Sequence, residues 1–186
     1  ILSGNIAMIK HASNVLGCCL MINEVFSDNI DCKIFFPLLL PHSKIEHIIK
    51  DPIVKAISLT GSEKAGSKVG SIAGREIKKI LLELGGSDAF ILCKDANILE
   101  ASKKAVLSRM LNTGQSCIAA KRFIVHKNIK EQFINNLINI LDDMKIGNPS
   151  NPKTQIGPMA RQDILNDIKN QFHDAINKGA ILRYQM

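Results

Sequence analysis

The sequence has 186 residues, a length that suits one domain or two incomplete ones. Hydrophobic residues make up 46% of the chain, which supplies material for a packed core and argues against a disordered tail. The net charge is +7, but the basic residues are scattered, Trp is absent and Tyr occurs once, so a nucleic-acid-binding module is disfavoured. The apolar runs 15–22 and 34–40 are too short to span a membrane.

Strand and helix signals alternate along the chain. In chain order, the predicted elements are a strand at 5–10, a helix at 14–25, a strand at 54–60, a helix at 63–73, strands at 79–84 and 89–93, a helix at 97–111, a strand at 122–126, and helices at 129–144 and 164–176. Segment 28–42 is irregular, because Pro37 and Pro41 interrupt it. This alternation predicts a mostly parallel, layered α/β architecture with a domain boundary at Gly85-Gly86.

The cysteines argue against a disulfide framework and against a zinc site. Their number is odd and no CxxC pair occurs. A reducing, cytoplasmic setting fits this pattern, and most of the thiols are expected to be small core residues. The five positions are Cys18, Cys19, Cys32, Cys93 and Cys117.

A short turn that ends at Cys117 is the first candidate for chemistry. It begins near Asn112, contains Gly114, follows a predicted helix and precedes a predicted strand. A thiol on such a turn is exposed and lies beside backbone N–H groups, which favour the thiolate and can hold an oxyanion. Taken alone, a single cysteine is more often buried packing, so this interpretation depends on the other motifs.

Glu83 is the second candidate, at the end of an apolar strand and just before Gly85-Gly86. Burial there would favour the neutral carboxyl group and would suit Glu83 to act as a general base. The alternative is a carboxylate at a strand edge that faces water.

Gly61 marks the third candidate, a glycine turn between a predicted strand and a predicted helix. The N-terminus of such a helix offers free N–H groups and a positive dipole end to a phosphate. Residues 61–68 read GxxxxGSK, but a P-loop requires Lys before the Ser or Thr, which argues against an NTPase. A plain strand-to-helix turn is the alternative.

These motifs occur in an order that resembles the NAD(P)-dependent aldehyde dehydrogenases, and succinate-semialdehyde dehydrogenases in particular. The resemblance covers nearly the whole chain. It is carried by Gly4-Asn5, Lys10, Thr60-Gly61-Ser62 and residues 82–86, 114–117, 147–149 and 157–159.

The resemblance implies a three-layer α/β fold with a parallel sheet, incomplete at both ends. Residues 1–85 would be the latter part of a Rossmann-like cofactor-binding domain, and residues 86–186 the first part of a catalytic domain. Full-length relatives are expected to be homo-oligomers. The oxyanion-hole Asn of the family would lie upstream of Ile1, and a Glu that holds the nicotinamide ribose would lie beyond Met186.

The resemblance also implies the site. Cys117 would be the nucleophile, Glu83 the general base, NADP or NAD the cofactor, and no metal would take part. Ser13 stands where many NAD-preferring relatives have Glu, and loss of that carboxylate favours NADP or dual use. The cofactor-binding positions would be Lys10, Ser13, Thr60, Gly61, Ser62, Gly66, Leu84 and Gly85.

The leading hypothesis is an enzyme that oxidises a small aldehyde, succinic semialdehyde or a similar one. Arg122 or Lys121 could contact the substrate carboxylate, or both could be plain exposed strand positions. The alternative is an inactive remnant or a split-enzyme fragment that needs complementing segments. An isolated fragment of this kind would expose hydrophobic surface and uncovered sheet edges.

Overall fold

The computed structural model describes residues 1–30 and 33–185. It separates into two compact units, Ile1–Glu83 and Leu84–Met186. Every pair of strands in it runs parallel, which confirms the predicted α/β fold with parallel pairing.

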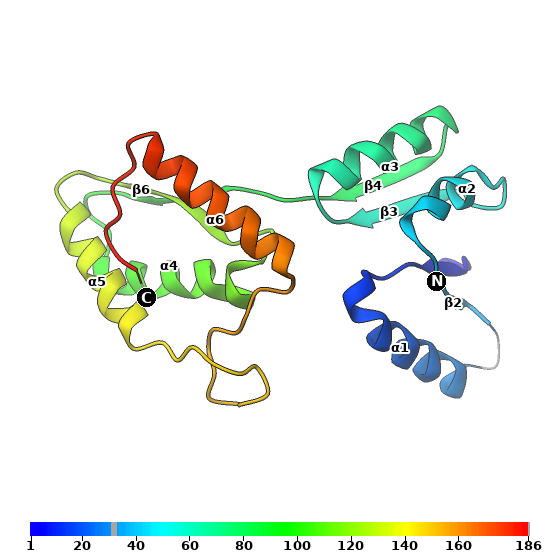
Figure 1. The fold of residues 1–186 in the computed structure, drawn as a ribbon, viewed down its shortest axis with the longest axis horizontal. Helices are drawn as coiled ribbons and strands as arrows, with labels where there is room; N and C mark the ends of the chain where they lie inside the picture. Colours follow the sequence, from blue (N-terminus) through cyan, green and yellow to red (C-terminus); the bar gives the residue numbers. More distant parts are fainter. Residues whose placement is uncertain (31–32, 186) are drawn as a thin grey trace. The chain divides into compact units, whose positions relative to one another are not determined.

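The first unit contains two small sheets and three α-helices (Figure 1). Strand β1 pairs with β2, and β3 pairs with β4 so that Thr60 lies opposite Glu83. The elements are β1 (Ala7–Ile9), a short 3-10 turn (Ser13–Val15), α1 (Leu16–Asn29), β2 (Phe35–Pro37), a second 3-10 turn (His42–Lys44), α2 (Ile45–Lys50), β3 (Ala56–Thr60), α3 (Glu63–Arg75) and β4 (Lys79–Glu83).

Helix α3 packs against the β3–β4 pair and fixes its position (Figure 1). Ser62 caps its N-terminus, because the Ser62 hydroxyl accepts a hydrogen bond from the Ala65 N–H at 3.3 Å. Ile72 and Ala73 of α3 are buried together with Ile49 of α2, which forms the core of this unit. One face of α3 is thus buried in this core, as is usual for an amphipathic helix.

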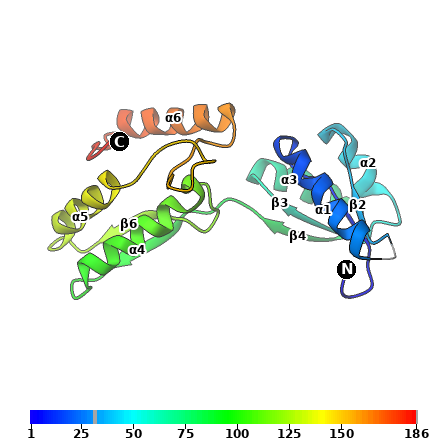
Figure 2. The same cartoon turned by 90° about the horizontal axis from the view of Figure 1, so that it is seen from below.

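The second unit is built on the parallel pair β5–β6 (Figure 2). Its core joins Leu92, Ala105, Ile129 and Phe133. The ring of Phe123 lies between those of Phe90 and Phe133, with centroids 5.7 Å and 6.0 Å away. The elements are β5 (Asp88–Leu92), α4 (Ile98–Met110), a 3-10 turn (Leu111–Gly114), β6 (Ala120–Val125), α5 (Lys130–Asp142) and α6 (Gln162–Asn177).

Two elements were not predicted. Strand β2 lies inside the segment that was expected to be irregular, with Pro37 as its last residue, and α2 is a short helix of six residues. Pro37 is tolerated because it pairs with Ile9 at the end of the ladder, where a missing N–H costs little.

The expectation that most thiols are core residues is wrong for the described cysteines. Cys19 is buried, but Cys18, Cys93 and Cys117 are exposed. Cys32 lies outside the described residues. Within residues 1–30 and 33–185, no helix combines the length and apolar character needed to cross a membrane. In the same part of the chain, no cluster of three or more His, Cys, Asp or Glu is arranged to hold a metal ion.

Candidate active site

The backbone before Cys117 follows an unusual path. The 3-10 turn Leu111–Gly114 has φ of 52° at Asn112, 59° at Thr113 and 75° at Gly114. Asn and Gly tolerate this left-handed conformation, but a β-branched residue such as Thr113 adopts it at a cost on the order of 1–3 kcal/mol. Strain of this kind persists only where surrounding contacts hold it.

Arg109 provides one of these contacts from the end of α4. Its Nη1 donates a hydrogen bond to the Gly114 carbonyl oxygen at 2.9 Å. The approach is so close that a Cβ at position 114 would lie 2.6 Å from Arg109 Nη1. Gly114 is therefore favoured by its backbone conformation, and a larger residue there would also force the Arg109 guanidinium to move from its hydrogen bond.

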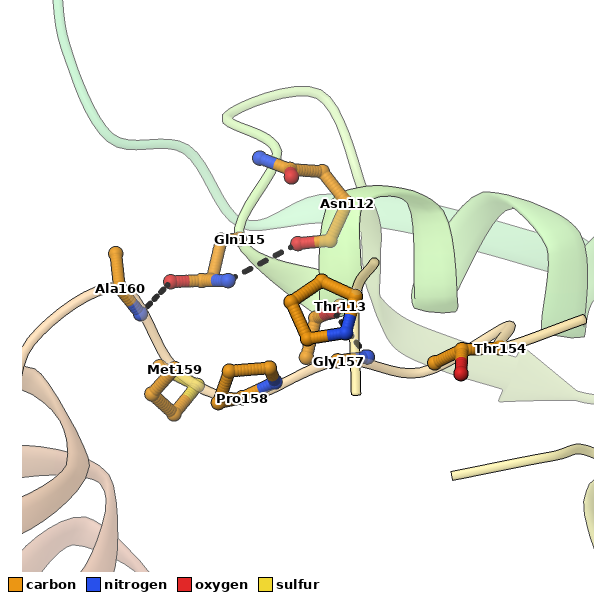
Figure 3. A pocket seen from close by; sticks show the side chains of 9 residues that line it. Asn112, Thr113, Gln115, Thr154, Gly157, Pro158, Met159 and Ala160 are labelled. Atoms are coloured by element: carbon orange, nitrogen blue, oxygen red, sulfur yellow. Dashed lines mark hydrogen bonds between the residues drawn. The ribbon is translucent and has the colours of Figure 1, made fainter. Parts of the chain in front are cut away.

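The segment 157–160 also contacts the turn (Figure 3). The Gly157 N–H donates to Thr113 Oγ1 at 3.1 Å, and the Ala160 N–H donates to Gln115 Oε1 at 3.0 Å. Gln115 Nε2 in turn donates to the Asn112 carbonyl at 3.2 Å. A cleft of about 420 Å³ lies between this turn and segment 157–160.

Cys117 follows this turn and is exposed, as the sequence predicts. Its carbonyl oxygen accepts a hydrogen bond from Lys121 Nζ at 3.1 Å. The same carbonyl lies so near Gly86 that a Cβ there would be 3.0 Å from it. The thiol is thus carried on a tightly fixed main chain, which is the situation that a nucleophile requires.

Glu83 departs from the sequence expectation. It is the last residue of β4, and every residue of that strand is exposed, so the expected burial of its carboxylate is wrong for the structure described here. Glu83 belongs to the first unit and Cys117 to the second. That Glu83 acts as the general base for a reaction at Cys117 therefore stays a prediction.

Gly61 and Ser62 lie at the carboxyl end of β3, where α3 begins. The Gly61 N–H donates to the Glu83 carbonyl at 3.0 Å, which joins this turn to the end of β4. Gly66 is buried inside α3, and its N–H donates to the Ser62 carbonyl at 2.9 Å. The helix therefore already begins at Glu63, within the stretch that forms the phosphate-binding loop of an NTPase.

Lys10 and Ser13 lie just after β1, and Ser13 is exposed. Lys10 Nζ donates to the carbonyl of His11 at 2.8 Å. The buried Nδ1 of His11 has no hydrogen-bond partner among the described residues. Lys10, His11 and Ser13 lie beside the β1–β2 pair, whereas the Gly61 turn lies beside the β3–β4 pair. In the described part of the chain, no hydrogen bond joins Lys10, His11 or Ser13 to the Gly61 turn. Leu84 is half-buried and Gly85 is exposed, both directly after β4.

The sequence analysis did not identify the side chains that support the turn at residues 111–117, which we call the cysteine turn. Arg109, Thr113 and Lys121 act through the main chain, and no residue pattern distinguishes such a side chain from an ordinary surface residue. Lys121 was considered only as a contact for a substrate carboxylate, but its ammonium group is occupied by backbone carbonyls. Arg122 is exposed, and its Nε donates to the Ser87 carbonyl at 2.8 Å.

Comparison with known proteins identifies the protein family of this chain. The chain is a member of the aldehyde dehydrogenase family, whose model matches residues 1–185. It is 45% identical over 184 residues to a succinate-semialdehyde dehydrogenase [NADP(+)] of Mycobacterium avium, and the match covers 98% of this chain. That match covers only 39% of the relative, so the chain spans about two fifths of the length of the curated proteins it resembles.

Solved structures lead to the same family. A succinic semialdehyde dehydrogenase from Streptococcus pyogenes in complex with NADP+ matches with a TM-score of 0.93 and 33% identity. It covers 97% of this chain, and the chain covers 40% of it. A lactaldehyde dehydrogenase matches with a TM-score of 0.93 and 30% identity over 98% of this chain and 39% of its own.

Proposed function

We propose that this chain carries the nucleophile and the general base of an aldehyde dehydrogenase. The reaction would oxidise succinic semialdehyde, or a similar small aldehyde, to its carboxylic acid. The main observation behind the proposal is the exposed Cys117 thiol after a strained turn that is held by hydrogen bonds with Arg109 and Gly157. The name and identity of the Mycobacterium avium relative support the substrate class.

In the first step, Cys117 loses its proton and its sulfur attacks the aldehyde carbon. A C–S bond forms and the carbonyl oxygen becomes an oxyanion. The Cys117 backbone N–H is proposed as one donor to this oxyanion, a type of contact whose removal costs on the order of 10²–10³ in rate in other enzymes. When bound, NAD(P)+ supplies the hydride acceptor that turns the adduct into a thioester on Cys117.

In the second step, the Glu83 carboxylate accepts a proton from a water molecule. The water oxygen attacks the thioester carbon, the C–S bond breaks with its electron pair on sulfur, and the carboxylic acid leaves. The Cys117 thiolate then takes up a proton from solvent, and Glu83 releases its proton to solvent. A thioester is reactive enough for water, which explains why cysteine suits both steps. A reducing, cytoplasmic location is part of the proposal, because an exposed nucleophilic thiol must remain unoxidised.

The residues of the first unit fit a dinucleotide. The N-terminus of α3 after Gly61 and Ser62 presents N–H groups that lack intrahelical partners. The unpartnered buried Nδ1 of His11, beside Lys10, leaves a polar atom that a ribose or phosphate group could satisfy. Thr60 and Gly66 of this unit, with Leu84 and Gly85 that directly follow it in the sequence, complete the proposed cofactor positions. Since Ser13 carries no charge, NADP is expected to bind at least as well as NAD, and a clear preference for NAD in competition binding would contradict this.

The test is NADPH or NADH production by the 186-residue chain with succinic semialdehyde, compared with Cys117→Ala and Glu83→Gln. We expect Cys117→Ala to abolish turnover. Glu83→Gln should permit one burst of NADPH and then stop, because the thioester forms but is not hydrolysed. Cys93→Ala, which removes another exposed thiol of the second unit, is the control and should leave turnover unchanged.

A second candidate is a chain that is inactive alone and works only with complementing segments. The large exposed apolar side chains favour it, together with the limited share of each relative that the chain spans. Under this hypothesis the isolated chain produces no NADPH, and addition of the remaining segments of a relative restores production that still depends on Cys117.

A further inference from the structure

Lys121 makes an unusual set of contacts below the cysteine turn. Its Nζ donates to the carbonyl oxygens of Ser116 at 3.1 Å, Cys117 at 3.1 Å and Ala119 at 3.4 Å. The side chain starts in β6 and turns back on the residues that precede the strand. An ammonium group has three donor directions, and all three are used by one short stretch of main chain.

This arrangement determines where the neighbouring N–H groups point. In a trans peptide the C=O and the following N–H are antiparallel, and the described chain has no cis peptide. The carbonyls of Ser116 and Cys117 face the ammonium, so the N–H groups of Cys117 and Ile118 face away from it. The peptide between Ala119 and Ala120 has the same arrangement: the Ala119 carbonyl faces Lys121, and the Ala120 N–H donates instead to Ser108 Oγ at 3.1 Å.

The Cys117 and Ile118 N–H groups are available for a ligand. Among the hydrogen bonds of the described residues, neither group donates one. They are adjacent, they belong to the residue with the exposed thiol and the residue after it, and Ile118 is itself exposed. Two such consecutive N–H groups form a nest that can bind an oxyanion.

We infer that Lys121 is a positioning residue that orients the Cys117 and Ile118 N–H groups as an oxyanion-binding pair. The cation would also polarise the two peptide groups and make their N–H groups stronger donors. Lys121 would not touch the substrate itself. The inference rests on the proposed role of Cys117 as nucleophile.

The test compares two reactions of the same thiol. In acyl transfer from p-nitrophenyl acetate, the Cys117 sulfur bonds to the ester carbon, p-nitrophenolate leaves with the bonding electrons, and an oxyanion forms in between. In alkylation by iodoacetamide, the sulfur displaces iodide and no oxyanion forms. Peptide mass spectrometry measures both reactions at Cys117, with exposed Cys93 of the same unit as an internal reference thiol.

We expect Lys121→Met to slow acyl transfer to Cys117 about tenfold or more, while alkylation of Cys117 changes less than about twofold. Lys121→Arg keeps the charge and several donors, and should retain acyl transfer within about threefold of the unchanged chain. Lys127→Met is the matched control, because it removes one exposed positive charge just after β6. It should change neither reaction.

Three outcomes would overturn the inference. Equal slowing of both reactions in Lys121→Met would mean that Lys121 only maintains the fold of the turn. Unchanged acyl transfer would mean that the carbonyl contacts have no effect on the oxyanion. If acyl transfer in Lys121→Arg were as slow as in Lys121→Met, a positive charge that binds these carbonyls would not be what orients the N–H groups. Neither acyl transfer nor alkylation needs a cofactor. A failure of NADPH production alone would therefore count against the proposed function and not against this inference.

Discussion

At the scale of single residues, the conformation of the turn before Cys117 depends on contacts with residues outside the turn. The pattern Gly114 to Cys117 indicates a turn with an exposed thiol, and the structure has both features. The positive φ values of Asn112 and Thr113 were not predictable, because neither residue type requires a left-handed conformation. Their conformation is set by Arg109 and by the segment after Gly157, which are tertiary contacts.

Glu83 shows the opposite error at the same scale. Its apolar neighbours in the sequence suggested burial, but α3 covers the two-stranded β3–β4 pair only in part, and every residue of β4 is exposed. Burial of a strand depends on what covers the sheet, which a local pattern does not contain.

Gly114→Ala tests whether the turn depends on glycine. The substitution places a Cβ 2.6 Å from Arg109 Nη1 at a position with φ of 75°. We expect the free energy of unfolding of the second unit to fall by about 2 kcal/mol, and acyl transfer to Cys117 to slow with it. Urea denaturation measures the first effect.

Gly179→Ala is the control for this prediction. Gly179 lies in the same unit and also has positive φ, 93°, but an added Cβ would meet nothing within 4 Å. Its cost should be about 1 kcal/mol, from backbone conformation alone. Equal losses in the two variants would show that the contact with Arg109 contributes nothing.

At the scale of elements, the long periodic helices and most of the short strands were predictable, whereas α2 and β2 were not. Helices α3, α5 and α6 have apolar residues at helical spacing, and their predicted positions are confirmed to within a few residues. Helix α2, with six residues, is too short to show a period. Strand β2 contains a proline, and it exists because β1 offers it a parallel partner from far along the chain.

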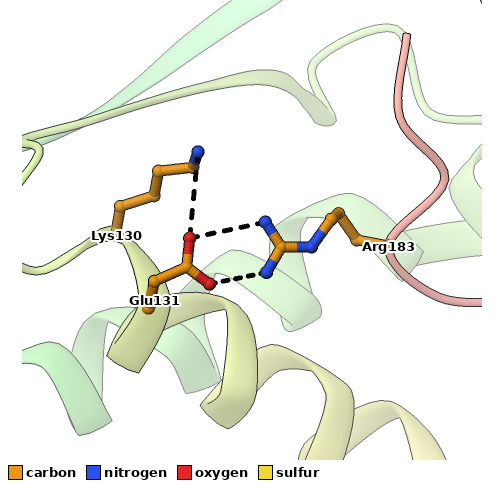
Figure 4. A network of polar contacts seen from close by, with 3 residues as sticks. All are labelled: Lys130, Glu131 and Arg183. Carbon is orange, nitrogen blue, oxygen red and sulfur yellow. Dashed lines mark hydrogen bonds and ion pairs between the residues drawn. The ribbon is translucent and has the colours of Figure 1, made fainter.

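The last described segment illustrates a further contact that no local pattern predicts. Arg183 donates to both oxygens of Glu131 in α5, at 2.5 Å and 3.4 Å, and Lys130 Nζ lies 3.8 Å from one of them (Figure 4). The Arg183 hydrogen bond holds the pKa of Glu131 below its usual value. Next to it, the Tyr184 hydroxyl donates to the Asp142 carboxylate.

Asp142→Asn tests how this segment docks on α5. The hydrogen bond to Asp142, and then desolvation and the nearby negative charge, raise the pKa of Tyr184 above its ordinary value of 10.0. Because the folded pKa is raised, the neutral phenol stabilises docking fully below the unfolded pKa, and this contribution is lost as pH rises through the folded pKa. Tyr184 is the only tyrosine and Trp is absent, so ultraviolet absorbance follows its ionisation directly.

The expected midpoint of Tyr184 ionisation lies above 10.0 in the unchanged chain and returns toward 10.0 in Asp142→Asn. Asp143→Asn is the control, since it removes the same charge one residue later and leaves the Asp142 carboxylate that accepts the Tyr184 hydrogen bond in place. An identical midpoint in the unchanged chain and in Asp142→Asn would show that the segment is not docked in solution.

At the scale of the whole molecule, the accessible surface is large for the chain length. It amounts to 13521 Å², whereas two separate globular units of this combined size would expose roughly 10,600 Å². Many large apolar side chains are among the exposed residues, as the sequence led us to expect. Helix α1 shows the effect clearly, because Cys19 is its only buried residue while Met21 and Val25 are 66% and 62% exposed.

This surface predicts strong binding of an apolar fluorescent dye by the folded chain. A double variant, Met21→Lys with Val25→Lys, should lower dye fluorescence measurably, because contiguous apolar patches are what such dyes bind. Its free energy of unfolding should change by less than about 0.5 kcal/mol, since exposed positions contribute little to stability. The control pair Glu24→Gln with Asp28→Asn alters charge on the same helix without removing apolar area, and should leave the fluorescence unchanged. Weak dye binding by the unchanged chain would mean that these side chains are covered in solution, either by a second copy of the chain or by a different arrangement of α1. Light scattering at several protein concentrations distinguishes these two causes, because only the first one changes the molecular mass.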